Sequence, residues 1–422
     1  MAVTIALGYQ YLWVDRYCIS TDSAQKHQQI SEMDLVYCSA HATIIAESAQ
    51  IPSDGLPGVS TRCRQRQPQI TLDKGVLRHT LPHGGAVIGN SKWASRAWCY
   101  QEYCLSRRRL FFTQSQVIFE CAKTQAHETM STSQAYFLAE EARPWKSFFP
   151  ACYFATEHSA STRHVWDSIY NYTGRAMSYE SDALNAMLGL FKVFQSSPVP
   201  IYHFWGVPYR PWANRSDLIE NPISSLCWYI LGSWKRRRTF PSWSWLGWSG
   251  SVLSEFHDKQ DTETDHDLRI GAETRDGNEV QGWPPELCTK NRLAPYLLLE
   301  GKTSQLKCSR QDEHRLWYLR AVDGGEWLVL SDEIGFYAGG NPMSPHCVLE
   351  GEISDGEKGH HDSLTAVLLG TDSGLIYLLV LERNRTLDNE KRIGCERIGY
   401  IKIHRFDVMA KIQWENRRLR VG

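Results

Sequence analysis

The sequence predicts an α/β domain over residues 1–125, a mainly helical region over residues 126–240 and a β-rich region over residues 241–422. Three observations lead to this division. The first 46 residues contain an apolar segment, a helical periodicity and a second apolar segment, which is the order strand, helix, strand. Apolar residues recur at helical spacing through most of the middle region. From Pro241 onward, short alternating segments are separated by glycine and aspartate, a pattern typical of β-structure.

The N-terminal domain is expected to contain a parallel sheet. Residues 11–15 (YLWVD) are aromatic and apolar and end in a carboxylate, which predicts a buried strand. Residues 24–40 carry one apolar stripe and predict a helix. Residues 43–46 predict the next strand, and a helix over residues 91–106 and a hairpin over residues 110–121 complete the domain.

The remaining segments are predicted more coarsely. Residues 52–90 are rich in proline, glycine, arginine and glutamine, which predicts a long irregular insertion with at most a short hairpin. Helices are expected over residues 166–173, 182–194 and 225–234. Residues 351–363 are rich in glycine, aspartate and histidine and are expected to form an exposed loop.

Composition and charge exclude several classes of protein. The 46 basic and 47 acidic residues leave a net charge of −1, so no long-range field attracts nucleic acid or an anionic membrane. The longest apolar runs are too short to span a bilayer, and no signal peptide is evident. The 12 cysteines form no CxxC pair and no metal-type spacing with histidine. We therefore expect reduced thiols in a cytoplasmic protein without a bound metal.

Four segments, in order, resemble the fungal heterokaryon-incompatibility (HET) family. The first covers residues 11–19 and continues through residues 28–33 and 36–40. The second is residues 55–58 (GLPG), and the third is residues 96–102 (RAWCYQE). The fourth consists of Arg175, Asp182, Leu184, Ala186 and Gly189, with the PSWSW stretch at residues 241–245. Each segment alone is weak evidence for the family, whereas all four in this order are strong evidence for the resemblance.

The resemblance implies a self/non-self recognition module that triggers cell death through association with other proteins, including other HET or incompatibility partners. HET domains are thought to be distant relatives of TIR domains, which implies a flavodoxin-like sheet. Some TIR domains cleave NAD at the nicotinamide bond with a glutamate on a helix. The alternative function is therefore a TIR-like NAD glycohydrolase, with NAD as substrate and no other cofactor.

The resemblance also predicts an incomplete domain. HET domains usually open with a strand and an "LSY.WG"-like motif well before the segment that corresponds to residues 11–15. About ten residues precede Tyr11 in this chain, so its first strand and loop are expected to be missing. Either the gene start is assigned too late or the chain is a degenerate member, and we expect a non-catalytic or inactive form.

Glu102 is the candidate catalytic residue. It follows Trp98 by four positions, so the two share a helix face, and a carboxylate beside an indole is partly desolvated and has a raised pKa. Such a carboxylate can stabilise an oxocarbenium-like ribosyl cation or accept hydrogen bonds from ribose hydroxyls, by analogy with glycoside hydrolysis. The alternative is a surface glutamate paired with an arginine.

The candidate binding residues are Asp15, Arg96, Trp13 and Trp98. Asp15 ends the predicted strand, where it can position ribose or accept a hydrogen bond from the following loop. Arg96 can bind a phosphate or pair with Asp15 or Glu102. The two tryptophans can stack on a base, although packing in the core is the more common role.

Two other patterns carry less information about function. Cys18 and Cys99, with His27 or His41, match no known thiol-enzyme signature. The pair at residues 360–361 (HH) falls in the expected loop and lacks further metal ligands.

Two patterns lie near the start of the β-rich region. The basic run at residues 235–238 is expected to be a solvated or helix-terminal cluster, with a binding patch as the alternative. Trp243, Trp245 and Trp248 alternate at strand-like spacing and are expected to pack this region against its neighbour, with a partner or carbohydrate surface as the alternative.

Overall fold

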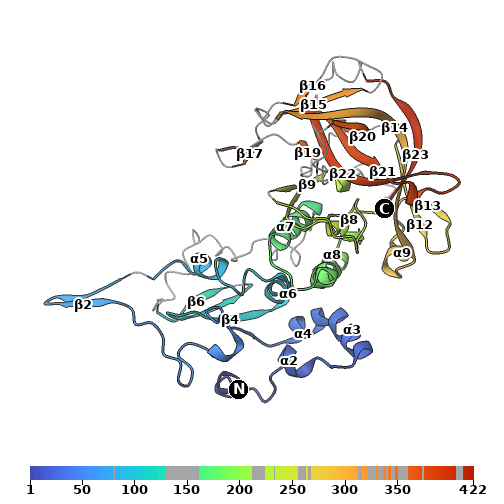
Figure 1. The fold of residues 1–422 in the computed structure, drawn as a ribbon. Coiled ribbons are helices and arrows are strands. Elements are labelled where there is room, and N and C mark those ends of the chain that lie inside the picture. The colour runs from blue at the N-terminus through green and yellow to red at the C-terminus, as the bar shows by residue number, and fades with distance from the viewer. Residues whose placement is uncertain are drawn as a thin grey trace. The chain divides into compact units, whose positions relative to one another are not determined.

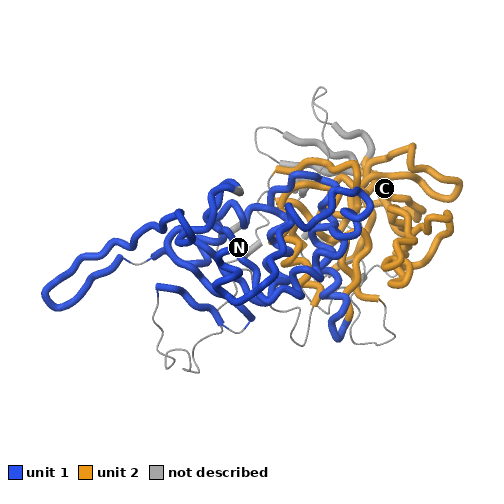
Figure 2. The backbone as a smooth tube through the Cα atoms, turned by 90° about the horizontal axis from the view of Figure 1, so that it is seen from below, with its two compact units in different colours: residues 1–160, 174–199 blue, residues 161–173, 200–422 orange. Residues whose placement is uncertain are grey.

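A computed structural model of the chain describes residues 1–79, 81–122, 124–129, 161–211, 224–231, 233–254, 263–264, 268–311, 316–321, 328–330, 336–338, 341–343, 347–349, 360–372, 375–404 and 412–422. The chain forms two compact units (Figure 2). Unit 1 consists of Met1–Ala160 and Gly174–Val199, and unit 2 consists of Ser161–Thr173 and Pro200–Gly422. The domain boundaries at residues 125 and 240 stay predictions.

Unit 1 combines short helices with a small sheet (Figure 1). Its helices are α1 (Ala2–Ala6), α2 (Asp15–Cys18), α3 (Ser23–Ser31), α4 (Met33–Ser39), α5 (Gly84–Gly89), α6 (Ala97–Leu105), α8 (Asn185–Gln195) and the 3-10 turns η1 (Pro52–Asp54) and η4 (Glu180–Ala183). Its strands are β1 (Thr43–Ile45), β2 (Gln69–Leu72), β3 (Gly75–Arg78), β4 (Arg108–Phe112), β5 (Val117–Cys121) and β6 (Gln125–His127).

The sheet of unit 1 is mixed, with strand order β1-β4-β5-β6. Strand β1 runs parallel to β4, with Thr43 opposite Arg109, whereas β4, β5 and β6 are antiparallel neighbours. The expected flavodoxin-like parallel sheet is therefore reduced to one parallel pair. The predicted strand at residues 11–15 is wrong, because residues 11–14 have no strand conformation and Asp15 opens α2. Tyr11 is 89% exposed, so the aromatic pattern of this segment does not reflect burial.

The other N-terminal elements are found, some with different bounds. The helix over residues 24–40 is split into α3 and α4, and Asp22 caps α3 by accepting hydrogen bonds from Ala24 N and Gln25 N at 3.1 and 3.0 Å. The hairpin over residues 110–121 is β4 and β5, and the insertion contains one hairpin, β2–β3, which extends away from the rest of unit 1 (Figures 1 and 2). The predicted helix at residues 91–106 begins only at Ala97, because a turn stabilised by the Ser91 hydroxyl precedes it.

Unit 2 is dominated by strands. Its helices are α7 (Thr162–Thr173), α9 (Pro285–Thr289) and the 3-10 turns η5 (Ser224–Leu226), η6 (Trp245–Gly247) and η7 (Arg385–Leu387). Its strands are β7 (Tyr202–Phe204), β8 (Val207–Tyr209), β9 (Trp228–Leu231), β10 (Ser251–Ser254), β11 (Glu263–Thr264), β12 (Arg269–Thr274), β13 (Glu279–Gln281), β14 (Leu293–Gln311), β15 (Leu316–Ala321), β16 (Leu328–Leu330), β17 (Phe336–Ala338), β18 (Asn341–Met343), β19 (Cys347–Leu349), β20 (His360–Asp372), β21 (Leu375–Arg383), β22 (Ile393–His404) and β23 (Glu415–Val421).

Five of these strands close into a barrel. The hydrogen-bonded ring runs β14-β20-β21-β22-β23 and returns to β14, and only the β22–β23 pairing within it is parallel. Leu364, Ala366 and Leu368 alternate along β20 into one apolar cluster, while Val367 and Leu369 on its opposite face are also buried. Burial on both faces explains the apolar runs at residues 366–369 of β20 and 376–381 of β21.

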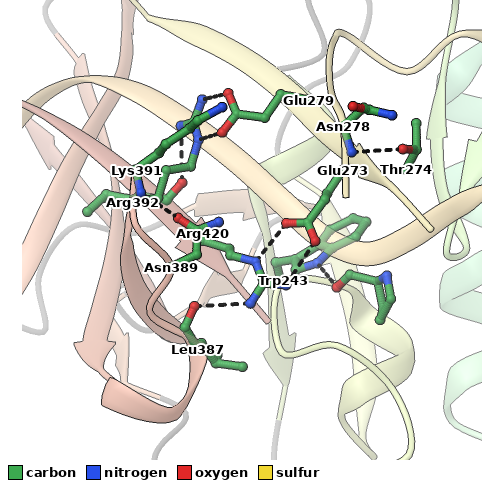
Figure 3. A network of polar contacts seen from close by, with 12 residues as sticks. Trp243, Glu273, Thr274, Asn278, Glu279, Leu387, Asn389, Lys391, Arg392 and Arg420 are labelled. Carbon is green, nitrogen blue, oxygen red and sulfur yellow. Dashed lines mark hydrogen bonds and ion pairs between the residues drawn. The ribbon is translucent and has the colours of Figure 1, made fainter. Parts of the chain in front are cut away.

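Two bidentate ion pairs brace the barrel (Figure 3). Arg420 on β23 binds Glu273 on β12 through two contacts of 2.8 and 3.0 Å. Arg392 binds Glu279 on β13 with the same two distances. Bidentate arginine–carboxylate pairs fix orientation as well as distance, so they hold β12 and β13 in register against the barrel.

The predicted helical region over residues 126–240 is not found as one body in the described residues. Helix α8 belongs to unit 1 and α7 to unit 2, and strands β7 and β8 follow. The predicted helix at residues 225–234 is wrong, because Trp228–Leu231 forms strand β9, paired with β10. Its aromatic and β-branched residues favour a strand.

Other expectations for the C-terminal half also change. Trp245–Gly247 is a 3-10 turn, so the predicted strand through Trp243, Trp245 and Trp248 is wrong, although all three side chains are buried. Residues 235–238 are not a solvated patch throughout, because Arg237 is buried and Arg236 donates to the carbonyls of Phe240 and Gly247. Of the predicted loop at residues 351–363, residues 360–363 belong to β20 and the others lie outside the described residues.

Candidate functional site

Helix α6 carries Glu102 and is fixed by the segment that forms η4 and α8. Its buried residues are Ala97, Cys99, Tyr100, Gln101, Tyr103 and Leu105. The amide of Ala97 donates to the carbonyl of Ala176 at 2.9 Å, and the amide of Gly189 donates to Oε1 of Gln101 at 2.9 Å. The position of Glu102 therefore depends on residues that follow it by more than 70 positions in the chain.

Two motif positions whose roles the sequence did not reveal secure α6. The guanidinium of Arg175 lies 4.8 Å from the centre of the Tyr100 ring and donates to the carbonyl of Ala94. Gly189 lies where α4, α6 and α8 meet, and a Cβ there would be 2.7 Å from Leu105 and 2.8 Å from Asp34. Only glycine permits this close approach.

The Glu102 carboxyl is surrounded by polar and aromatic groups. The indole N–H of Trp93 donates to its Oε2 at 3.3 Å. The Tyr37 hydroxyl and the Cys99 thiol also interact with this carboxyl. The indole expected beside Glu102 was that of Trp98, whereas the indole hydrogen-bonded to it is that of Trp93, which precedes α6.

The surroundings of Glu102 shift the pKa of its carboxyl upward. Burial raises the pKa of Glu102, the Trp93 N–H and the charge of Arg96 oppose this rise, and the charge of Asp15 adds to it. Burial is also the main reason why the pKa of Tyr37 is raised, and the charge of Glu102 contributes. Glu102 and Asp15, predicted to meet, are thus close enough for one charge to affect the other.

Asp15 has a structural contact of its own. It is the first residue of α2, and its Oδ1 accepts a hydrogen bond from the amide of Arg16 at 2.6 Å. A carboxylate in the first turn also stabilises the positive end of the helix. Asp15 is exposed, so its carboxylate is also open to a ligand.

The other three predicted binding residues each have part of the side chain open to solvent. Arg96 is the exposed N-cap of α6, and no ion pair to it is found among the described residues. Trp13 is 37% exposed and makes an edge-to-face contact with Tyr37 at 6.3 Å. Trp98 is half-buried. Neither tryptophan belongs to the buried core, in contrast to their more common packing role.

The thiol and metal patterns find no geometric support in the described part of the chain. Burial raises the pKa of Cys99, which disfavours a nucleophilic thiolate. Cys18 is exposed, and its sulfur accepts from the amide of Val14 at 3.4 Å. Cys104 is disulfide-bonded, which corrects the expectation of reduced thiols for this residue. Among the described residues, no three or more His, Cys, Asp or Glu side chains gather as metal ligands.

The described helices include none with the length and apolar character that a bilayer crossing requires.

The chemistry that the Glu102 cluster can perform follows from its functional groups. The carboxyl groups of Glu102 and Asp15, the indole N–H of Trp93 and the guanidinium of Arg96 can together bind a cationic or hydroxyl-rich group and hold a phosphate beside it.

Comparison with known proteins identifies one family. Residues 1–102 match the family model described as "Heterokaryon incompatibility protein (HET)". No curated protein and no solved structure matches the chain. The match ends at Glu102 and includes Trp13, Asp15, Arg96 and Trp98. Residues 1–102 of this chain are therefore a heterokaryon-incompatibility (HET) domain sequence.

Proposed function

We propose that this chain acts in heterokaryon incompatibility as a cytoplasmic self/non-self recognition module that signals cell death by associating with other proteins. The observation that carries the proposal is the HET match over residues 1–102. Partners include second copies of a HET domain and other incompatibility proteins. Neither nucleic acid nor a membrane is among the expected partners, because the net charge is −1 and no described helix suits a membrane.

An exposed hairpin supports association as the mode of action. In β2–β3, Ile70 pairs with Leu77, and side chains alternate along each strand, so Ile70, Leu72 and Leu77 share one face. These three side chains are 62, 57 and 62% exposed. An apolar face on a hairpin that extends away from its unit (Figure 1) is a typical protein-binding surface.

The test places two charges on that face. The chain carrying Ile70→Asp and Leu77→Asp is expected to lose growth arrest when it is expressed in a fungal host, because the apolar face becomes charged. The matched control carries Thr71→Asp and Val76→Asp, which are directly opposite each other on the other face. Equal loss of arrest in both variants, or in neither, contradicts a role for this face.

A second function is favoured by the Glu102 cluster. Under this proposal the domain hydrolyses NAD, and the Glu102 carboxylate stabilises the ribosyl cation that forms when nicotinamide leaves. Arg96 then binds phosphate, Asp15 positions ribose hydroxyls, and Trp13 or Trp98 stacks on a ring. The supporting observation is a carboxyl held by Trp93 and Tyr37 beside a second carboxylate.

The two functions are separated by one variant. Purified protein incubated with NAD is expected to release nicotinamide under the second proposal, and Glu102→Gln is expected to abolish the release. Because the raised pKa of Glu102 leaves less carboxylate at low pH, the release should fall as the pH is lowered. Equal turnover in Glu102→Gln removes Glu102 from the mechanism. Growth arrest that persists in Glu102→Gln favours association over catalysis.

A further inference from the structure

Unit 1 contains a cavity of about 260 Å³ that does not involve the Glu102 cluster. It lies where the parallel strands β1 and β4 end, because Glu47 and Ser48 follow β1 and Thr113 follows β4. The carboxyl ends of parallel strands are the edge at which α/β proteins bind small molecules. Its volume is just below the roughly 300–1,000 Å³ of pockets for drug-sized ligands, so a smaller ligand fits.

The cavity lining has two chemical characters. Leu81, Val87 and Ile118 contribute apolar surface, while Gln50 and Gln116 contribute amide groups. Glu47 is the only ionisable side chain among the described residues that line it. A ligand that fits this lining has an apolar body and a polar end that meets a carboxyl group.

Glu47 is buried without a hydrogen-bonding partner among the described residues. It is 6% exposed, and burial raises its pKa to about 7, against the opposing charge of Arg62. The donors of Arg62 are directed elsewhere: they bind the carbonyls of Ser48 and Gly55 at 3.1 and 2.8 Å and Oε1 of Gln114 at 3.3 Å. The carboxyl is therefore left to interact with whatever enters the cavity.

A buried carboxyl with a structural role in the same unit has a different environment. Glu120 is 3% exposed and is satisfied twice, by the Tyr103 hydroxyl at 2.8 Å and by Nε of Arg109 at 3.2 Å. Burying a carboxyl without such partners costs stability. Glu47 has no such hydrogen bonds among the described residues and lines a cavity instead, where a ligand can supply them.

We propose that this cavity binds a small organic cation, an amine or amidine with an apolar body, whose N–H groups donate to Glu47. The ammonium or amidinium supplies the N–H donors that the Glu47 carboxylate lacks among the described residues, and a bidentate amidinium matches both carboxylate oxygens. The apolar body contacts Val87 and Ile118.

The test uses benzamidine, with its neutral isostere benzamide and the anion benzoate as comparisons. Calorimetric titration of the full chain at pH 8 is expected to show benzamidine binding, with benzamide weaker and benzoate unbound. Glu47→Gln is expected to weaken benzamidine roughly ten- to a hundredfold, the range for a lost charge-assisted hydrogen bond. The control Glu32→Gln removes an exposed carboxylate outside the cavity and should change nothing.

A second variant tests the cavity without touching the carboxyl. Val87 is half-buried in the lining, and Val87→Phe should exclude both benzamidine and benzamide by filling the space. The proposal is overturned by no benzamidine binding at millimolar concentration, by equal affinity for benzamidine and benzamide, or by unchanged benzamidine affinity in Glu47→Gln or Val87→Phe.

Discussion

At the scale of the residue, three glutamates of unit 1 show how the surroundings of a carboxyl decide its chemistry. Glu120 is held by a tyrosine and an arginine, Glu102 by an indole near a second carboxylate, and Glu47 faces a cavity. Burial acts on Glu47 and Glu102 in the same direction, because it disfavours the charged form of each. Their side chains therefore bind protons more tightly in the folded chain than in the unfolded one.

This difference predicts how the stability of the chain depends on pH. The pKa of Glu47 is about 7 when folded, against 4.5 for its ordinary value, so its contribution is complete below pH 4.5 and is lost as the pH rises to 7. The loss amounts to about 3 kcal/mol at most. Urea unfolding between pH 5 and 8 should show Glu47→Gln gaining stability over the parent chain as the pH rises, with Glu32→Gln as control. A constant difference across this range contradicts the raised pKa.

A second residue prediction concerns Arg397, which the sequence did not single out. It is fully buried on β22, lies 3.5 Å from the Trp228 ring centre and donates to the carbonyls of Leu226 and Trp228. Arg397→Leu leaves these carbonyls without that donor and should lower the free energy of unfolding by about 2–4 kcal/mol. Arg418, paired with Glu300 at the surface, is the control, and Arg418→Leu should cost less than about 1 kcal/mol. Similar losses in the two variants would show that the buried contacts matter no more than the exposed pair.

At the scale of the element, the position of α6 depends on how closely α8 packs against it. An alanine in a helix interior is normally more favourable than glycine by about 1 kcal/mol. In α8, the Cβ of an alanine at position 189 would lie 2.8 Å from Oε1 of Gln101 and 2.7 Å from Leu105. The packing of α8 against α6 thus reverses the usual preference.

The reversal predicts that Gly189→Ala destabilises the chain by about 1–3 kcal/mol, the usual cost of overpacking. The displacement of α6 should also reduce any activity that depends on Glu102. Gly75→Ala is the control, because no atom lies within 4 Å of the added carbon. The measurement is the melting temperature of both variants in thermal unfolding. A melting temperature for Gly189→Ala above that of the parent chain would mean that α6 and α8 are not closely packed.

The sequence predicted elements well where their cause is local. The hairpin of β4 and β5 and helix α3 follow from turn residues and from apolar periodicity. Residues 11–15 and β9 were misassigned, because an apolar pattern does not show whether its residues are buried or which strand they pair with. The closure of the barrel depends on pairing of β14 with β20, which are far apart in the chain, so no local pattern indicates it.

The candidate site was predictable to a similar extent. Asp15 and Arg96 lie close enough to Glu102 for their charges to act on its pKa, while the roles predicted for all three stay predictions. Trp93 and Tyr37 were missed, because Trp93 lies in a turn and Tyr37 on α4, outside the motif around Glu102. Glu47 was missed because the cavity forms only where β1 and β4 lie side by side and end together, which the sequence around Glu47 does not indicate.

At the scale of the whole molecule, the HET match is shorter than the body that contains it. Unit 1 also needs β4, β5 and β6 beyond residue 102, and α8 beyond residue 184. Trp93, for example, packs against Phe111 of β4 at 5.8 Å. The matched segment by itself therefore lacks the core residues that β4, β5 and α8 contribute, such as Phe111, Ile118 and Phe191.

This predicts that a fragment of residues 1–102 does not fold. It should show no cooperative urea transition and a weak near-ultraviolet circular dichroism signal, whereas the full chain should show both. The fragment lacks the sheet neighbours of β1 and the anchors of α6. A sharp unfolding transition in the fragment would mean that the matched segment has a sufficient core of its own.

The path of the chain between the units has a consequence for how the protein is made. Residues 161–173 belong to unit 2, yet they leave the ribosome before α8, which completes unit 1, and before β10, against which α7 packs. During synthesis from the N-terminus, Trp166 and Ile169 of α7 stay exposed to solvent until the later segments that bury them have been made. A chimera joined at residue 125 would divide unit 1 between two parents. A junction just after residue 199 keeps unit 1 in one parent, but α7 then has to pack against a β10 from the other parent.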